Sequence, residues 1–184
     1  MVAAIAKLAR RAGPGAGQTR VIAIDGRSGS GKTSLAARLR PALGAPVVAL
    51  EDLYGGWDGL ERGIDLLVSE VLKPLSAGRA AQVPRYNWGT ATWEAPRVLA
   101  PPEVLIVEGA GAGARRAAAY ASLLIWIEEA ESVRKKRALD RDGATFAPYW
   151  DTWAAQEEAM LARERTPDRA GIVLDSTTGH ILRG

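Results

Sequence analysis

The sequence feature that most constrains the fold is the glycine-rich octet Gly26-Arg27-Ser28-Gly29-Ser30-Gly31-Lys32-Thr33. An apolar run typical of a strand precedes it at 21–25, and residues typical of a helix follow it at 34–39. The octet fits the P-loop (Walker A) pattern, which requires a strand before it and a helix after it. A purely structural turn is the alternative, and this context disfavours it. We therefore expect an α/β protein built around a phosphate-binding loop.

Each part of the octet has a physical role in holding a triphosphate. Its glycines allow the positive φ angles and close backbone approach that a phosphate cradle needs, and successive N–H groups then point at the anion. Lys32 is expected to reach the β- and γ-phosphates, and the Thr33 hydroxyl to bind Mg²⁺. ATP and Mg²⁺ are the expected cofactors. The residues predicted to contact the nucleotide are Gly26, Ser28, Gly29, Ser30, Gly31, Lys32, Thr33, Ser34 and Arg134.

Composition narrows the class of protein. A chain of 184 residues suits a single domain, here 1–184. It has no cysteine and one histidine, His180, which excludes a disulfide framework and a thiolate zinc site. The net charge is +3, but acids and bases are interspersed, so we expect no nucleic-acid partner. No apolar run approaches the ~20 residues that span a bilayer. We expect no membrane partner and a cytoplasmic location, and a homo-oligomer is left open.

Residues 1–19 are predicted to form an N-terminal helix and a linker. Val2, Ile5 and Leu8 fall on one helical stripe, and glycines and a proline at 13–17 end the segment. A targeting peptide is the alternative, because the first twenty residues are basic and contain no acid. The absence of serine and of a cleavage site disfavours it.

Strand-like and helix-like segments alternate along the rest of the chain. Apolar runs occur at 47–50, 104–107, 123–127 and 171–175, in addition to the one before the octet. Helical patterns occur at 60–72, 132–140 and 146–165. Alternation of this kind predicts a three-layer α/β/α sandwich with a five-stranded parallel sheet.

Acidic residues end several of these runs, at the sheet edge where ligands bind in open parallel sheets. Either Glu51 or Asp52 is a candidate general base, and Glu51 could also hold Mg²⁺ through water. Glu108 ends another run, like a Walker B strand with Glu in place of Asp, and is expected to bind Mg²⁺. The alternatives are solvated acids at the strand ends and, for Glu108, a structural acid. Glycines at 109–113 lack the dinucleotide spacing and are expected to form a flexible turn.

The segment 55–102 is too long for a plain connection, so we interpret it as an acceptor-binding excursion. It is rich in Gly, Pro, Trp and Tyr. Aromatic side chains in a loop-rich segment are expected to line a pocket whose flat faces stack on a nucleobase-like acceptor. This group comprises Tyr54, Trp57, Tyr86, Trp88 and Trp93. Trp126, Trp150 and Trp153 are assigned to the core.

The segment 131–145 is predicted to be a lid. Arg134, Arg137 and Arg141 place guanidinium groups on one short helix, where they would close over the transferring phosphate. Arg137 and Arg141 are the predicted catalytic lid residues, together with Lys32 and the pair Glu51 and Asp52. A solvated charged face is the alternative.

Together these motifs resemble the uridine kinase-like branch of P-loop kinases, over about 21–175. The resemblance rests on the P-loop and on Glu51-Asp52-Leu53-Tyr54, Pro84-Arg85-Tyr86-Asn87-Trp88, Val107-Glu108-Gly109 and Arg141-Asp142. It implies ATP-dependent phosphorylation of a hydroxyl on a nucleoside or another small metabolite, with Glu51 as the base. The residues expected to bind the acceptor are Tyr54, Trp57, Arg85, Tyr86, Asn87 and Trp88. The chain departs from the family pattern at Glu51 and Asn87, where Asp is usual, and lacks the histidine that often follows Asn87.

Two other functions stay open at this point. In a nucleoside monophosphate kinase, an arginine of the excursion would bind the acceptor's phosphate, and the candidates are Arg62, Arg79, Arg85 and Arg97. A nucleotide-binding regulatory protein would keep the ATP site and lose phosphoryl transfer. Glu51 and Asn87 motivate this third interpretation.

Overall fold

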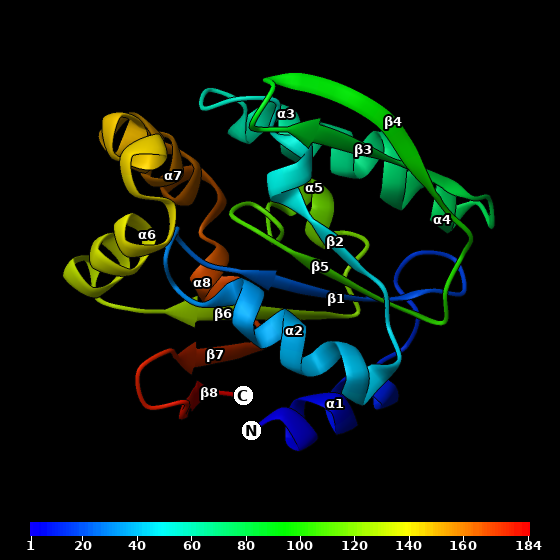
Figure 1. Ribbon diagram of the computed structural model, residues 1–184. Coiled ribbons are helices and arrows are strands. Elements are labelled where there is room, and N and C mark those ends of the chain that lie inside the picture. Colours follow the sequence, from blue (N-terminus) through cyan, green and yellow to red (C-terminus); the bar gives the residue numbers. More distant parts are fainter.

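The computed structural model describes residues 1–184 apart from the side chain of Asp142, which followed Arg141 in the motif above and lies outside the described residues. A six-stranded sheet with the order β2–β5–β1–β6–β7–β8 forms its centre (Figure 1). The strands are β1 (Arg20–Asp25), β2 (Val47–Ala49), β5 (Val104–Glu108), β6 (Leu123–Glu128), β7 (Ile172–Asp175) and β8 (Ile181–Arg183).

The α/β class and the five predicted parallel strands are confirmed, but the sheet has six strands rather than five. The sixth, β8, pairs with β7 in antiparallel orientation. It is only three residues long and exposed along its length. Such a short, exposed edge strand has no alternation of buried and exposed residues, so the sequence pattern could not reveal it.

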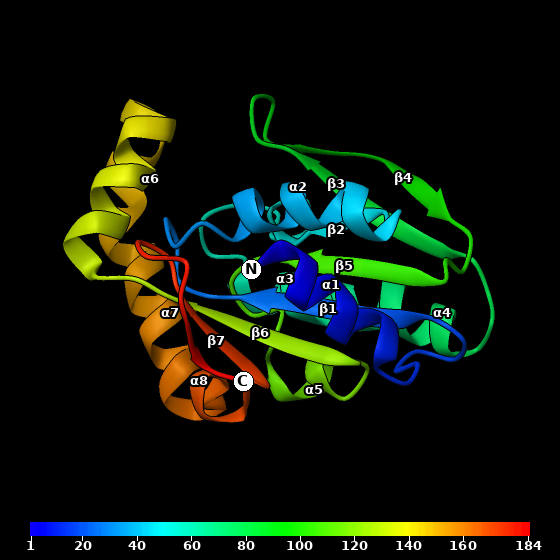
Figure 2. The ribbon, with the colours of Figure 1, turned by 90° about the horizontal axis from the view of Figure 1, so that it is seen from below.

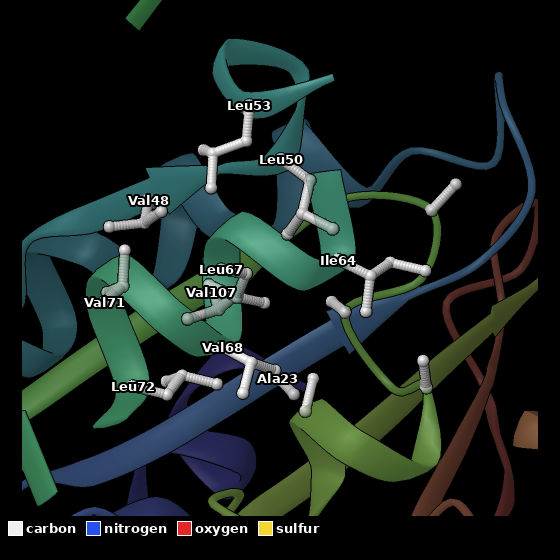
Figure 3. Close-up of a cluster of buried hydrophobic side chains, with 14 of the residues drawn as sticks. Ala23, Val48, Leu50, Leu53, Ile64, Leu67, Val68, Val71, Leu72 and Val107 are labelled. Carbon is white, nitrogen blue, oxygen red and sulfur yellow. The ribbon is translucent and has the colours of Figure 1, made fainter. Parts of the chain in front are cut away.

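Strand β1 is buried on both faces, which explains its unbroken apolar run. Val21 and Ala23 belong to one core cluster, and Ile22 and Ile24 to the other. Helices α1 (Val2–Arg11) and α2 (Lys32–Leu43) cover the second cluster's face (Figure 2). On the opposite face α3 (Leu60–Leu66) and the π-helical η2 (Leu67–Leu72) pack against the sheet, and Figure 3 shows part of that cluster.

The excursion at 55–102 contains more regular structure than expected. After α3, η2 and α4 (Lys73–Ser76), the chain forms an antiparallel hairpin of β3 (Ala81–Asn87) and β4 (Thr92–Leu99). This hairpin was not expected, because the prolines of the segment suggested a loop. The register shifts at Pro84, between Val83 and Arg85, which is where a residue without an N–H is tolerated in a strand.

The carboxyl ends of the parallel strands face the α6–α7 helix pair (Figure 1). Helix α6 (Glu131–Phe146) is longer than the predicted helix and is kinked at Gly143, where φ is 50° and ψ is −132°. It continues through η3 (Ala147–Tyr149) into α7 (Trp150–Glu164). The remaining short helices are η1 (Leu50–Leu53), α5 (Arg115–Ala118) and α8 (Thr166–Arg169).

The glycine-rich turn at 109–113 is not the flexible turn that its sequence suggested. Its alanines Ala110 and Ala112 are buried. Asp25, at the end of β1, accepts hydrogen bonds from the N–H groups of Gly111 at 3.0 Å and Gly113 at 2.8 Å. A buried carboxylate with N–H donors from the turn fixes the backbone, so these glycines are needed for tight approach rather than for mobility.

Candidate active site

The P-loop adopts the backbone that its glycines predicted. The φ angles of Gly26, Gly29 and Gly31 are 156°, 79° and 97°, which an L-residue rarely adopts. Gly31 is also the N-cap of α2, so the positive end of a twelve-residue helix faces the loop. At Gly29 an added Cβ would lie 2.1 Å from the Arg134 carbonyl oxygen. Glycine is therefore required there because α6 packs directly on the loop.

Lys32 and Thr33 connect the P-loop to Glu108, the predicted metal-binding acid at the end of β5. Lys32 is buried, and its Nζ donates to the Arg27 carbonyl oxygen at 3.0 Å. The Thr33 hydroxyl donates to Glu108 Oε1 at 3.1 Å. Burial raises the pKa of Glu108, and the charge of Lys32 opposes this shift. Thr33 and Glu108 thus place two oxygen atoms side by side at the first turn of α2.

These two oxygens fit Mg²⁺, a hard cation that takes oxygen ligands and keeps several waters and phosphate oxygens in its shell. Among the described residues, no group of three or more His, Cys, Asp or Glu side chains could hold a metal ion. A site with one hydroxyl and one carboxylate therefore suits a cation that arrives with the nucleotide. Glu51, the other predicted metal residue, lies across the same cavity.

The two candidate bases, Glu51 and Asp52, are placed differently by the 3₁₀ turn η1. Glu51 lines the cavity next to the P-loop. Asp52 is not among the lining residues, and the charges that act most strongly on it are those of Arg85 and Arg97 in the hairpin. Desolvation raises the pKa of Asp52, and the two guanidinium groups oppose the shift. The structure therefore brings Glu51, and not Asp52, to the phosphate site.

One cavity joins the P-loop to Glu51 and Glu108 and to a group of aromatic side chains. We call this group the aromatic wall; it comprises Tyr54, Trp57, Trp88, Phe146 and Trp153. Its lining residues are Ser28, Gly29, Lys32, Thr33, Glu51, Tyr54, Trp57, Trp88, Glu108, Gly109, Ala110, Arg141, Phe146 and Trp153. They come from the P-loop, η1, the excursion, the turn after β5, and the α6–α7 pair. Residues far apart in the sequence thus meet at the carboxyl edge of the sheet, as expected for an open parallel sheet.

Trp57 is the centre of the aromatic wall. Its ring stacks on the rings of Phe146 and Tyr149. The ring centroids are 4.9 Å apart in both pairs, and the ring planes are nearly parallel. It also lies 4.7 Å from Trp88, whose Nε1 donates to the Glu51 carbonyl oxygen at 3.0 Å. The wall therefore joins the excursion to the end of the lid helix and supports the backbone of the candidate base.

Three predicted acceptor residues lie outside this cavity. Arg85 pairs with Glu94 at 3.1 Å, and the Asn87 side chain donates to the same residue at 2.8 Å. Asn87 also accepts from the N–H of Gly89, which stabilises the hairpin turn. Tyr86 contacts the edges of Trp88 and Trp93 rather than the cavity. The hairpin thus presents Trp88 to the cavity and directs its neighbours elsewhere.

The three lid arginines have different surroundings. Arg134 is buried and donates to the Ser28 carbonyl oxygen at 3.2 Å, and burial lowers its pKa. Arg137 pairs with Glu129 at 3.0 Å. Arg141 lines the cavity, and its charge opposes the rise that burial causes in the pKa of Glu108. Arg134 therefore anchors α6 to the P-loop, and Arg141 is the lid arginine that reaches the acids.

A second cavity lies on the other side of the P-loop, between α2, α6 and the turn after β7. Ser30, Ser34, Arg137 and Gly179 are among its lining residues, so it extends from the P-loop to the turn after β7. The buried Ser30 hydroxyl has no hydrogen-bond partner among the described residues. A buried hydroxyl without a partner is unusual in a folded protein, and this one lies within the turn of the P-loop.

Two residues of this site, both on α7, were not among the predicted site residues. Trp153 was assigned to the core and is buried, yet it lines the cavity and its Nε1 donates to the Ser28 hydroxyl at 2.8 Å. Glu157, on the next turn of α7, accepts a hydrogen bond from the Ser28 N–H at 2.7 Å. The helical spacing of apolar residues in α7 predicted its buried face, and a Glu on that face was the available signal.

Residues 61–147 match the model of the phosphoribulokinase/uridine kinase family. The resemblance to uridine kinase-like P-loop kinases is thereby confirmed. The matched part of this P-loop kinase covers most of the excursion and the lid, which are the parts that the P-loop alone does not specify. No curated protein matches the chain.

Solved structures of kinases share the fold. A possible uridine kinase from Bacillus stearothermophilus has a TM-score of 0.63 and 20% identity, with 84% of this chain and 88% of that chain covered. A proposed fructose transport system kinase from Silicibacter sp. TM1040 has a TM-score of 0.64 and 20% identity, with 92% and 95% covered. In the described part of this kinase, no helix is long and apolar enough to cross a membrane.

Proposed function

We propose that this chain catalyses ATP-dependent phosphoryl transfer to a hydroxyl of a small metabolite that carries a flat ring, a nucleoside being the simplest example. The observation that carries the proposal is the shared cavity of Lys32, Glu51, Glu108 and the aromatic wall. It offers a phosphate cradle, a carboxylate within the same space and apolar faces for a ring.

The proposed reaction moves one phosphoryl group and one proton. The acceptor's hydroxyl oxygen attacks the γ-phosphorus, its proton passes to the Glu51 carboxylate, and the bond from the γ-phosphorus to the β–γ bridging oxygen breaks, so that ADP leaves. Lys32 and Arg141 stabilise the charge on the transferred group. Thr33 and Glu108 would hold Mg²⁺, which when bound would neutralise part of the negative charge on the phosphate oxygens.

The nucleoside monophosphate kinase alternative is less well supported. It requires a cation in the cavity for the acceptor's phosphate, and none of its four candidate arginines lines the cavity. Arg62 lies over the Trp93 ring at 5.3 Å, and Arg97 donates to the Val47 carbonyl oxygen at 3.2 Å. The acceptor side therefore favours a ring without a phosphate.

Two screens test this proposal. Nucleosides, vitamins and sugars are screened by thermal shift with a non-hydrolysable ATP analogue and Mg²⁺, because a bound acceptor stabilises the folded state by mass action. The compounds that stabilise the protein, and the matching nucleoside monophosphates, are then tested for γ-phosphate transfer. We expect transfer to the unphosphorylated compounds. Tight binding of the ATP analogue with no turnover of any acceptor would instead favour the regulatory protein.

A further inference from the structure

Glu157 is a buried acid that the reaction above does not use. Its exposed fraction is 1%, and it lies on the face of α7 that packs against the P-loop. Oε1 accepts from the Ser28 N–H at 2.7 Å, from the Ser28 hydroxyl at 2.8 Å and from Trp153 Nε1 at 3.0 Å. Oε2 accepts from Arg27 Nε at 3.3 Å. Both oxygens are thus satisfied, and three of these four hydrogen bonds come from the P-loop.

The same turn of α7 also holds the acceptor side of the cavity. Gln156, the residue before Glu157, donates from Nε2 to the Trp57 carbonyl oxygen at 2.7 Å. The centroid of the Trp153 ring lies 4.8 Å from that of Tyr54 and 6.4 Å from that of Trp57, and both pairs have a T-shaped geometry. One helical turn therefore touches the phosphate loop on one side and the aromatic wall on the other.

Apolar side chains would suffice if this contact only packed α7 against the loop. A buried carboxylate is instead costly unless it is hydrogen-bonded, and a charge-assisted hydrogen bond is directional. Glu157 fixes the orientation of the Ser28 backbone, and Gln156 fixes the backbone of Trp57. Because adjacent residues of a rigid helix make these two contacts, the distance between the two halves of the cavity is set by α7.

We propose that Gln156 and Glu157 are positioning residues, which hold the P-loop and the aromatic wall at a fixed separation so that the acceptor hydroxyl meets the γ-phosphate. The inference rests on the proposed kinase function. Reaction rates depend steeply on this separation, and a displacement of about 1 Å can cost about 10²-fold. Loss of either contact is therefore expected to lower kcat more than it weakens the binding of either substrate.

The kinetic test compares variants of Glu157 with a matched control. We expect Glu157→Ala to lower kcat by about 10²-fold, with KM for the acceptor and Kd for the MgATP analogue changed less than about threefold. Glu157→Gln should be intermediate, because its carbonyl oxygen can still accept from Ser28. Glu158→Ala, a change at the exposed neighbour, should behave like the unchanged protein. If Glu157→Ala does not fold, Glu157→Gln and Gln156→Met are used, each with an expected loss of about 10-fold.

Three results would overturn the proposal: a kcat within about twofold of wild type, an equal loss in Glu158→Ala, or a rise in the Kd of the analogue as large as the fall in kcat. If the wild-type protein transfers phosphate to no acceptor, the proposed function fails and amide hydrogen exchange tests the positioning alone. Glu157→Ala should then raise exchange in the P-loop and Gln156→Met should raise it in 54–57, with α1 unchanged in both variants. Unchanged exchange in both segments would contradict the proposal.

Discussion

The donor and acceptor halves of the cavity are built in different ways. The donor half is local, because eight consecutive residues form the P-loop and the next helix starts at Lys32. The acceptor half gathers Glu51, Trp57, Trp88, Phe146 and Trp153 from segments about a hundred residues apart. A local motif fixes its own geometry, whereas a wall assembled from distant segments depends on the whole fold. The donor half is accordingly the more predictable, and the acceptor half is the more open to a change of substrate.

The largest effect is expected in the donor half. Lys32→Ala should lower phosphoryl transfer by about 10³-fold, because it removes the buried cation that we propose stabilises the transferred phosphoryl group. The measurement is the rate of γ-phosphate transfer to whichever acceptor the screens identify.

Lys7→Ala is the control for this change, because Lys7 lies exposed on α1. Equal losses in the two variants would mean that the P-loop lysine has no special role in transfer.

The second prediction separates the two acids of η1, which sit at the boundary between the halves. Glu51→Gln should lower kcat by about 10²-fold, since it removes the proposed base from the cavity. Asp52→Asn should change kcat by less than about fivefold, because Asp52 lies toward the hairpin arginines. Steady-state rates of both variants check this assignment, and a larger loss for Asp52→Asn would reverse it.

The same contrast explains what the sequence could and could not predict. The P-loop, Glu108 and the parallel strands were predictable because glycine spacing and unbroken apolar runs report local backbone and burial. The choice between Glu51 and Asp52 depends on the backbone conformation of η1. Two adjacent acidic residues in a sequence do not show which side chain will point into the cavity. The pairing of Asn87 and Arg85 with Glu94 depends on a hairpin that prolines concealed. The role of Glu157 depends on the packing of α7 against the P-loop, a long-range contact that helical spacing does not report.

The third prediction concerns the aromatic wall. Trp57→Ala should raise KM for the acceptor by about 10-fold and leave KM for ATP nearly unchanged, because the lost ring contacts lie on the acceptor side. Trp93→Ala is a matched control, since Trp93 contacts Tyr86 outside the cavity. A rise in KM for ATP that matches the rise for the acceptor would show that the two halves are not separate binding surfaces.

The last prediction concerns stability rather than activity, at Asp25, where β1 supports both the P-loop and the buried glycine turn. Burial raises the pKa of Asp25 to about 6 from 3.8, and the N–H donors of Gly113, Gly26 and Gly111 oppose the shift. Between these pH values the folded protein binds the proton and the unfolded chain does not, so the free energy of unfolding falls as pH rises. The stabilisation is complete below about pH 4 and lost as pH rises through about 6, an effect of about 3 kcal/mol.

Denaturant unfolding of the wild-type protein and of Asp25→Asn, from pH 4 to pH 7.5, measures this contribution. Asn cannot ionise, so the difference in unfolding free energy between the two proteins isolates Asp25 from acids with lowered pKa, such as Glu61 and Glu164, whose contributions have the opposite sign. Wild type should lose stability relative to Asp25→Asn as pH rises through about 6. A difference that is constant from pH 4 to pH 7.5 would mean that the three N–H donors keep Asp25 ionised over this range. Burial of its charge would then cause no loss of unfolding free energy as the pH rises.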